Sequence, residues 1–161
     1  MRVPEGPQGR EMSELTVGVV RQDDAGERRV ALVPESVARL AALGLGTVVQ
    51  EGAGAAAWFP DAEYAAAGAT VLPGQALYER ADVVVCVHPP EGAPLRAGQL
   101  LLGLLQPLLE PALARRLAEA KVSAVSLDGL PRTLSRAQSM DALTSQANVA
   151  GYKAAVLAAD L

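Results

Sequence analysis

Polar and charged side chains gather near the end of the sequence, where a polar loop leads into a helical pattern. Gln138, Asp141 and Thr144 are spaced three residues apart, which predicts that they share one helix face near its start. Arg132 and Arg136 lie just upstream. Together these amide, carboxylate, hydroxyl and guanidinium groups can pair with a carboxamide such as that of a nicotinamide ring. The segment also fits a well-capped helix start, with Ser135 or Ser139 as the cap and Asp141 favourable to the helix dipole, so the chemistry alone leaves both interpretations open.

Two further candidates follow apolar runs of the sequence. Arg29 lies between a predicted strand and a predicted helix, at the carboxyl end of the strand, where ligands bind in open α/β sheets. Its guanidinium can hold a carboxylate bidentately, or it is an exposed surface arginine. His88, the only histidine, can serve as a general acid or base, although a histidine without a visible carboxylate partner is more often structural. Cys86 is most simply a small buried hydrophobe, and no cluster has metal-ligand spacing.

A glycine-rich segment, Gly52–Ala57, formally matches the G-x-G-x-x-A fingerprint of dinucleotide-binding loops. Its context argues against that function. Phe59 and Pro60 interrupt the helix that should begin inside the motif, and the motif follows the second predicted strand instead of the first. We therefore expect a flexible turn.

Apolar, β-branched runs alternate with helical segments along the chain. The runs that predict strands span residues 15–20, 47–50, 70–72, 82–87, 99–105 and 122–126. Pro34 and Pro111 open two of the helices, and Asp61 caps a third. This alternation predicts an α/β fold with a Rossmann-like (flavodoxin-like) parallel sheet covered by helices.

The last segment reads as one long helix from about Ser135 to the end. Its apolar positions fall at a spacing of three to four residues and form a narrow seam, Met140, Leu143, Ala147, Ala150, Ala154 and Leu157. No glycine or asparagine cap follows, and Asp160 is poorly placed for the negative end of a helix dipole. We therefore expect the natural polypeptide to continue.

Bulk properties narrow the class of protein. A length of 161 residues indicates one domain, and we expect a disordered leader over residues 1–12 and an α/β domain over residues 13–161. The net charge of −4 and the 3% aromatic content argue against a nucleic-acid partner. The apolar runs are shorter than the ~20 residues that a transmembrane helix needs. One cysteine allows no intrachain disulfide, which fits a cytoplasmic location.

Several segments resemble the α subunit of proton-translocating NAD(P) transhydrogenase, and the resemblance extends from about Leu15 to the last residue. The segments that carry it are Gly26–Pro34, Glu51–Gly54, Ala67–Ala69, Ser135–Leu143 and Ala147–Tyr152. The stretch from Ser135 to Tyr152 is the most specific part. The earlier motifs are shared with alanine dehydrogenase and its relatives.

The resemblance implies the first of two α/β lobes of an NAD(H)-binding component, with the true Rossmann fingerprint in a second lobe of the same subunit. Hydride would pass from NADH to NADP⁺ held by a partner component, and a membrane component would couple this step to proton movement. The resemblance also implies a homodimer, cytoplasmic and peripheral to the inner membrane through partner subunits. The fragment alone is expected to be inactive.

The resemblance also implies roles for individual residues. An arginine, a glutamine and an aspartate of the family position the nicotinamide ring. The glutamine and aspartate fall on Gln138 and Asp141, and a neighbouring hydroxyl falls on Thr144. The arginine falls on Arg132, with Arg136 as the alternative, because the loop is one residue longer here than in the family form.

An alanine dehydrogenase lobe is the second hypothesis, and a non-catalytic assembly lobe is the third. The amino-acid site of alanine dehydrogenases uses an arginine that matches Arg29, a lysine where this chain has Cys86, and a histidine near Gln106. Without the lysine and the histidine, a pyruvate imine lacks its cation and its proton donor. This argues against amino-acid oxidation and leaves Arg29 as a remnant of that pocket. Transhydrogenases also often carry the lysine, so Cys86 departs from both patterns.

Overall fold

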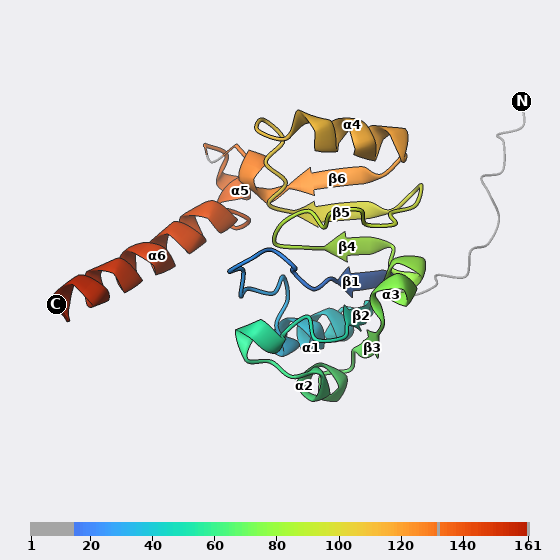
Figure 1. The fold of residues 1–161 in the computed structure, drawn as a ribbon, viewed down its shortest axis with the longest axis horizontal. Coiled ribbons are helices and arrows are strands. Elements are labelled where there is room, and N and C mark those ends of the chain that lie inside the picture. The colour runs from blue at the N-terminus through green and yellow to red at the C-terminus, as the bar shows by residue number, and fades with distance from the viewer. Residues whose placement is uncertain (1–14, 132, 161) are drawn as a thin grey trace, which may run out of the picture.

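The computed structural model describes residues 15–131 and 133–160, which form a six-stranded sheet with flanking helices (Figure 1). All five strand pairs are parallel, in the order β3-β2-β1-β4-β5-β6. The strands are β1 (Thr16–Val19), β2 (Gly46–Gln50), β3 (Thr70–Leu72), β4 (Val83–Val85), β5 (Leu100–Gly103) and β6 (Ser123–Ser126). This order is that of doubly wound dinucleotide-binding sheets and differs from the flavodoxin order. The predicted Rossmann-like parallel sheet is confirmed.

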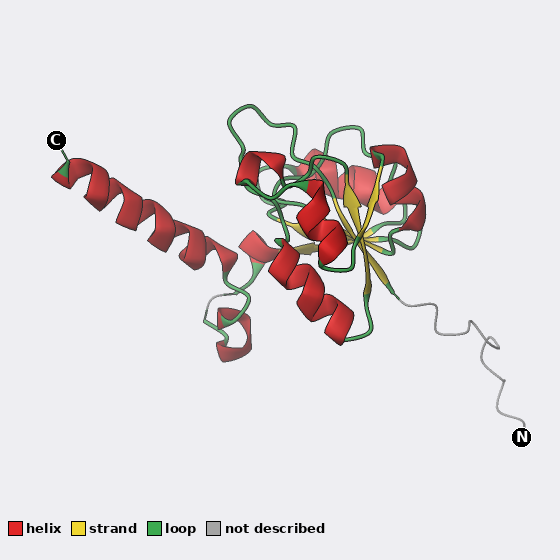
Figure 2. Ribbon diagram, turned by 90° about the horizontal axis from the view of Figure 1, so that it is seen from below, coloured by secondary structure: helices red, strands yellow, loops and turns green. Residues whose placement is uncertain are grey.

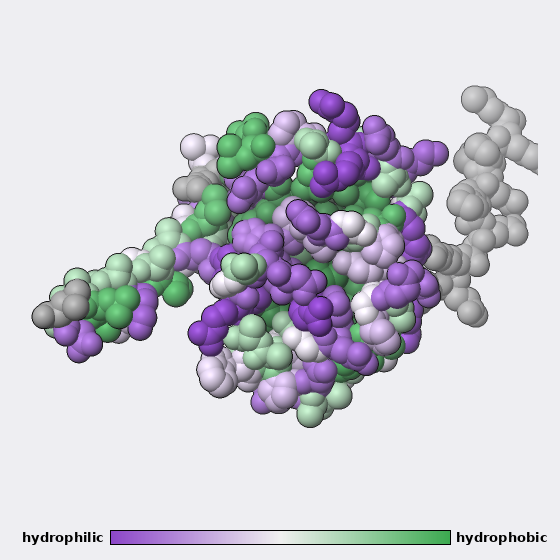
Figure 3. All heavy atoms as spheres, in the orientation of Figure 1, coloured by the Kyte–Doolittle hydropathy of each residue, from purple (hydrophilic) through white to green (hydrophobic). Residues whose placement is uncertain are grey.

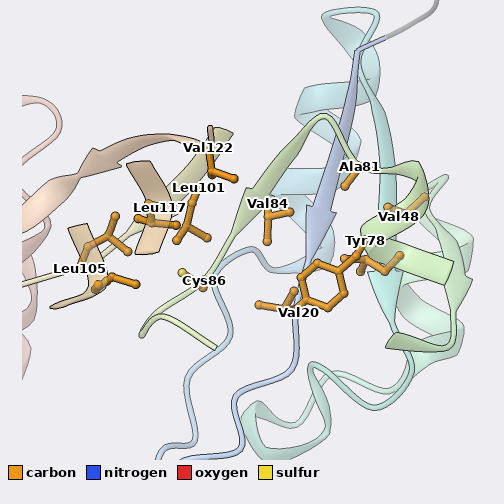
Figure 4. Packing of buried hydrophobic residues seen from close by; sticks show 12 residues of the cluster. Val20, Val48, Tyr78, Ala81, Val84, Cys86, Leu101, Leu105, Leu117 and Val122 are labelled. Atoms are coloured by element: carbon orange, nitrogen blue, oxygen red, sulfur yellow. The ribbon is translucent and has the colours of Figure 1, made fainter. Parts of the chain in front are cut away.

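Helices cover the sheet on two faces (Figure 2). Those between the strands are α1 (Pro34–Ala42), α2 (Asp61–Ala66), α3 (Gly74–Arg80) and α4 (Pro111–Glu119), with short 3-10 turns at η1 (Ala55–Ala57) and η2 (Leu127–Gly129). Because alternate strand residues face opposite sides, Val84 packs with α3 and α4 while Val85 packs with α1 and α2. Figure 4 shows the first of these cores, in which Tyr78 and Leu117 pack over the central strands.

Helix α3 was not expected, because its apolar pattern is too short to stand out in the sequence. Leu77 and Tyr78 are its buried residues, and Ala81 follows them into the core. Its first residue is Gly74, where a side-chain carbon would lie 2.9 Å from the Gln50 amide nitrogen. A larger residue here would require the flexible Gln50 side chain to move.

The predicted single C-terminal helix is wrong, because the chain forms two helices there. The first is α5 (Ser135–Gln138), and the second is α6 (Ala142–Ala159). Asp141 lies between them as the N-cap of α6, and its side chain accepts a hydrogen bond from the Thr144 amide. Because an N-cap residue has non-helical dihedral angles, the Asp141 cap separates the two helices.

Helix α6 projects from the rest of the described structure (Figures 1 and 2) and has no buried residue. Figure 3 shows apolar residues along much of its length. Of the predicted seam, Met140 lies before α6 and Leu143 is half-buried, whereas the positions from Ala147 to Leu157 are exposed. Among the described residues, no helix is both long and apolar enough to cross a bilayer. The leader expected at residues 1–12 lies outside the described residues.

Candidate functional site

The loops after β1 and β4 meet at the carboxyl edge of the sheet, where the strand order reverses. Glu27 and Arg29 come from the first loop, and His88 comes from the second. Arg29 binds Glu27 in a bidentate pair, in which Nε donates to Oε1 at 2.9 Å and Nη2 donates to Oε2 at 2.6 Å. His88 Nε2 lies 3.1 Å from the Glu27 Oε2 atom. The carboxylate partner that His88 lacks in the sequence pattern is therefore Glu27.

The Glu27 carboxylate neutralises the positive charge of the Arg29 guanidinium at this edge of the sheet. The hydrogen bond from the Arg29 guanidinium, with the backbone amides of Arg29 and Arg28, outweighs burial and lowers the pKa of Glu27 to about 2. The same pairing raises the pKa of Arg29. Both side chains are thus charged at neutral pH, although only 9% of the Glu27 side chain is exposed. The carboxylate that Arg29 binds in this structure belongs to the chain itself.

Glu27 is the member of this side-chain cluster that the sequence pattern did not single out. It lies two residues before Arg29, inside a motif that drew attention only for its arginines. A glutamate two residues before an arginine can form an ion pair with it, and this spacing in the sequence could have indicated the pair.

A cavity of about 290 Å³ opens next to Arg29. Apolar side chains of β4, β5 and the segment before α1 line it, with Cys86 in its wall and Gln146 of α6 at its side. As predicted, Cys86 is buried, with 4% of its surface exposed. Burial raises the pKa of its thiol to about 12, so the sulfur is neutral at pH 7. A thiol forms no cation at any pH and therefore cannot replace the ammonium of a lysine.

The predicted nicotinamide residues lie around the break between α5 and α6. Asp141 Oδ1 accepts the Thr144 amide at 2.9 Å, and the Thr144 hydroxyl donates to Oδ2 at 2.6 Å. Asp141 is half-buried, whereas Gln138 and Arg136 are exposed. The three residues Gln138, Asp141 and Thr144 do not share one helix face, because Gln138 ends α5 and Asp141 begins α6.

The predicted caps, Ser135 and Ser139, are wrong, because Ser135 lies inside α5 and Ser139 follows its last residue. The residue that caps a helix here is Asp141, at the start of α6. Gln138 and Asp141 nevertheless remain at or near the surface, where a ligand can reach them. Arg132, the first choice for the arginine, lies outside the described residues.

The glycine motif forms a turn, as expected, and does not lead into a long helix. The Gly52 amide donates to both oxygens of Asp61, at 2.9 and 3.1 Å, so this amide is already bonded. Asp61 was predicted to cap α2, but the N-cap residue is Pro60. A side-chain carbon on Gly54 would lie 2.6 Å from the Tyr64 ring, so this glycine serves packing.

The position that matches the histidine of alanine dehydrogenases also lies at this edge. Gln106 and His88 line a common cavity of about 270 Å³. The Asp128 carboxylate fixes the backbone there by accepting the amides of Leu105 and Gln106, at 3.0 and 2.9 Å. Burial opposes the charge of Asp128, but hydrogen bonds from these amides and from the Ser126 hydroxyl prevail and lower its pKa. Among the described residues, no group of His, Cys, Asp and Glu could hold a metal ion.

Comparison with known proteins shows which proteins share this arrangement. The family model described as "Alanine dehydrogenase/PNT, N-terminal domain" matches residues 18–150. The NAD(P) transhydrogenase subunit alpha of Cereibacter sphaeroides is 44% identical over 146 residues, which cover 88% of this chain and 28% of that protein. The alanine dehydrogenase of Bacillus subtilis is 31% identical over 148 residues, which cover 90% of this chain and 38% of that protein.

A solved structure gives the same result. The crystal structure of transhydrogenase from Sinorhizobium meliloti superimposes with a TM-score of 0.83 at 37% identity, over 89% of this chain and 44% of that one. The chain spans 28 to 39% of the length of the transhydrogenase relatives that it matches.

Proposed function

The chain belongs to the alanine dehydrogenase/PNT N-terminal domain family, and from this premise we propose that it is the first lobe of the NAD(H)-binding α subunit of an NAD(P) transhydrogenase. The observation that supports this most is the loop-and-helix segment, in which Asp141 and Thr144 are joined by two hydrogen bonds at the start of α6 and Gln138 is exposed at the end of α5. The higher identity to a transhydrogenase, 44% against 31% to an alanine dehydrogenase, supports the same choice.

The residues of this segment fit a nicotinamide carboxamide by their hydrogen-bonding capacity. The Asp141 carboxylate can accept from the carboxamide NH₂, and the Gln138 side chain can donate to its oxygen. The Thr144 hydroxyl, which donates to Asp141, retains lone pairs that can accept a further hydrogen bond. Arg132, or Arg136 in its place, would add a cationic donor. NAD(H), when bound, supplies the hydride, and these side chains hold and orient the ring.

The rest of the assembly belongs to the same proposal. Residues 13–161 would form this lobe, and a second Rossmann lobe of the subunit would bind most of the NAD(H). NADP(H) would be held on a partner component, and a membrane component would couple the reaction to proton translocation. The subunit would be a homodimer on the cytoplasmic side of the inner membrane.

The amino-acid dehydrogenase hypothesis is weakened at three positions of the carboxyl edge. Arg29 is paired with Glu27, Cys86 is a neutral thiol, and Gln106 replaces an imidazole with an amide. An amide cannot protonate an imine, because it has no titratable proton near neutral pH.

The activity of the complete subunit distinguishes these hypotheses. The subunit that contains this domain is combined with the NADP-binding and membrane components, and hydride transfer from NADH to an NADP⁺ analogue is followed by absorbance. We expect transfer, and no NADH formation from alanine and NAD⁺. Alanine-dependent NADH formation without transfer to the NADP⁺ analogue would establish the dehydrogenase instead. Absence of both activities would favour an assembly lobe.

A further inference from the structure

We propose that Arg29 is a positioning residue, which fixes the first turns of α6 against the sheet by binding Glu27 and Gln146 at the same time. The proposal rests on the proposed function, because Asp141 and Thr144 at the start of α6 are the residues proposed to hold the nicotinamide ring. It gives Arg29 a different task from that of a ligand-binding arginine.

The start of α6 is attached to the body of the domain by few contacts, and the Arg29–Gln146 hydrogen bond is one of them. Within this domain only Ala142 and Leu143, at the base of α6, are half-buried, so few apolar contacts hold the first turns of the helix against the sheet. The helix contacts η2 at its base and then projects away from the sheet (Figure 1). Arg29 Nη1 donates to the Gln146 side-chain oxygen at 3.1 Å, which joins α6 to the loop after β1, 117 residues earlier in the chain.

The anchor on the sheet side is rigid. Glu27 accepts the backbone amides of Arg28 and Arg29, at 3.0 and 2.8 Å, in addition to the two guanidinium bonds. His88 contacts the same carboxylate from the neighbouring loop. The planar guanidinium is thus held on one side, and its Nη1 donor points to α6. A lysine has no comparable fork and cannot make both contacts in one fixed geometry.

Gln146 lies close to the residues that are proposed to hold the nicotinamide ring, so its contact with Arg29 affects their position. Gln146 lies five residues after Asp141 and two after Thr144, so it is within about one and a half turns of the helix start. A helix segment of this length moves as a unit. A shift of α6 at Gln146 therefore displaces the Asp141 carboxylate and the Thr144 hydroxyl, and hydride transfer is sensitive to errors of about 1 Å in position.

Three variants of the complete subunit, assembled with its partner components, test the link. Gln146→Met removes the acceptor at an exposed helical site and retains helix propensity. Gln146→Glu retains an acceptor for Arg29. Lys153→Met is the matched control, because it changes an exposed residue of the same helix about two turns further on. The readouts are kcat and KM for NADH, and hydrogen exchange of the amides in residues 142–150.

We expect Gln146→Met to lower kcat by about tenfold with little change in KM, since the error is in orientation and not in overall affinity. Amide exchange over residues 142–150 should rise in the same variant. Gln146→Glu and Lys153→Met should match the parent protein in both readouts. An unchanged exchange rate in Gln146→Met overturns the proposal, whether or not kcat falls. Raised exchange with an unchanged kcat overturns it as well.

The exchange measurement also separates this proposal from the proposed function. If the parent protein transfers no hydride, the proposed function fails, while exchange still reports whether Arg29 and Gln146 hold α6. Faster exchange in Gln146→Met alone would then support the anchoring contact without its catalytic consequence, and equal exchange in all variants would refute it.

Discussion

At the scale of single residues, the charge on Glu27 decides what Arg29 can do. The two side chains neutralise each other at the switch point of the sheet, so an incoming carboxylate would have to displace Glu27 to reach the guanidinium. The sequence pattern identified Arg29 and its place at a strand end. It did not show that the partner comes from the same loop, since the pairing depends on how that loop folds back.

The Glu27 pair predicts a dependence of stability on pH. The pKa of Glu27 is lowered from 4.5 to about 2 in the folded protein. The pair therefore stabilises the fold fully above about pH 4.5, and this contribution is lost as the pH falls toward 2. Because 43% of the Arg29 side chain is exposed and solvent screens the pair, Glu27→Gln should reduce the free energy of unfolding by about 1–2 kcal/mol at pH 7, less than the full pKa shift implies. Urea unfolding followed by circular dichroism measures this.

The difference in the free energy of unfolding between the Glu27→Gln variant and the parent protein should decrease between pH 4.5 and pH 3. In this range Glu27 binds a proton in the unfolded parent protein but not yet in the folded one. A difference that is constant over this range would show that the ion pair does not account for the stability. Glu119→Gln, at an exposed position of α4, serves as the control.

Cys86 should be unreactive in the folded protein. Its thiol is buried and its pKa is raised to about 12, so the thiolate fraction is negligible at pH 8. Iodoacetamide labelling followed by mass spectrometry should show slow modification in buffer and rapid modification in urea. Rapid labelling without denaturant would contradict the burial of this residue.

At the scale of elements, the strands and the starts of α1 and α4 at Pro34 and Pro111 were predictable, whereas the break between α5 and α6 was not. The continuous apolar composition of residues 82–87 predicts a buried strand, and β4 lies within that run. The break at Asp141 depends on a local hydrogen bond to the Thr144 amide, which competes with continued helix. Apolar spacing continues across the break and therefore does not reveal it.

The N-cap gives a prediction for α6. Asp141→Ala should remove the cap and cost about 1 kcal/mol of local helix stability, whereas Asp141→Asn should retain the cap because asparagine is an equally good N-cap residue. Amide exchange at the start of α6 measures this difference. Equal exchange in the two variants would mean that the Asp141 side chain does not stabilise the helix.

Two glycines should respond in opposite directions to alanine. A side-chain carbon at Gly103 of β5 would lie 2.6 Å from the carbonyl oxygen and the sulfur of Cys86, so Gly103→Ala should destabilise the protein by about 1–3 kcal/mol. Gly151 of α6 has open space around it, and Gly151→Ala should increase the stability of that helix by about 0.5–1 kcal/mol. Urea unfolding tests the first, and amide exchange in α6 tests the second. A Gly103→Ala variant as stable as the parent would refute the close packing of β5 on β4.

At the scale of the whole molecule, the described residues form a sheet with the strand order of dinucleotide-binding domains. The strand order places the loops after β1 and β4 together, as in dinucleotide-binding sheets, but the turn after β2 bonds its own Asp61 and does not open a long helix. The fold class followed from the alternation of strands and helices. The absence of the fingerprint at the correct strand followed from the sequence as well.

This organisation predicts weak binding of NADH to the 161-residue chain by itself. The residues proposed to contact nicotinamide cover a small part of the cofactor, and the proposed function assigns the pyrophosphate to a second lobe. Isothermal titration calorimetry should give a dissociation constant for NADH above about 1 mM. This limit corresponds to a binding free energy of roughly −4 kcal/mol. Submillimolar affinity would place the main nucleotide site in this domain and contradict the two-lobe account.

The central claim is that the side chains around the start of α6 orient a nicotinamide ring for hydride transfer. The most direct measurement is the single-turnover rate of transfer from NADH to an NADP⁺ analogue by the complete subunit with its partner components. The Gln138→Ala, Asp141→Asn double variant, which retains the N-cap, is compared with the exposed control Arg115→Ala. The account predicts a loss of about 10²-fold in the double variant alone. A double variant as fast as the control would contradict it.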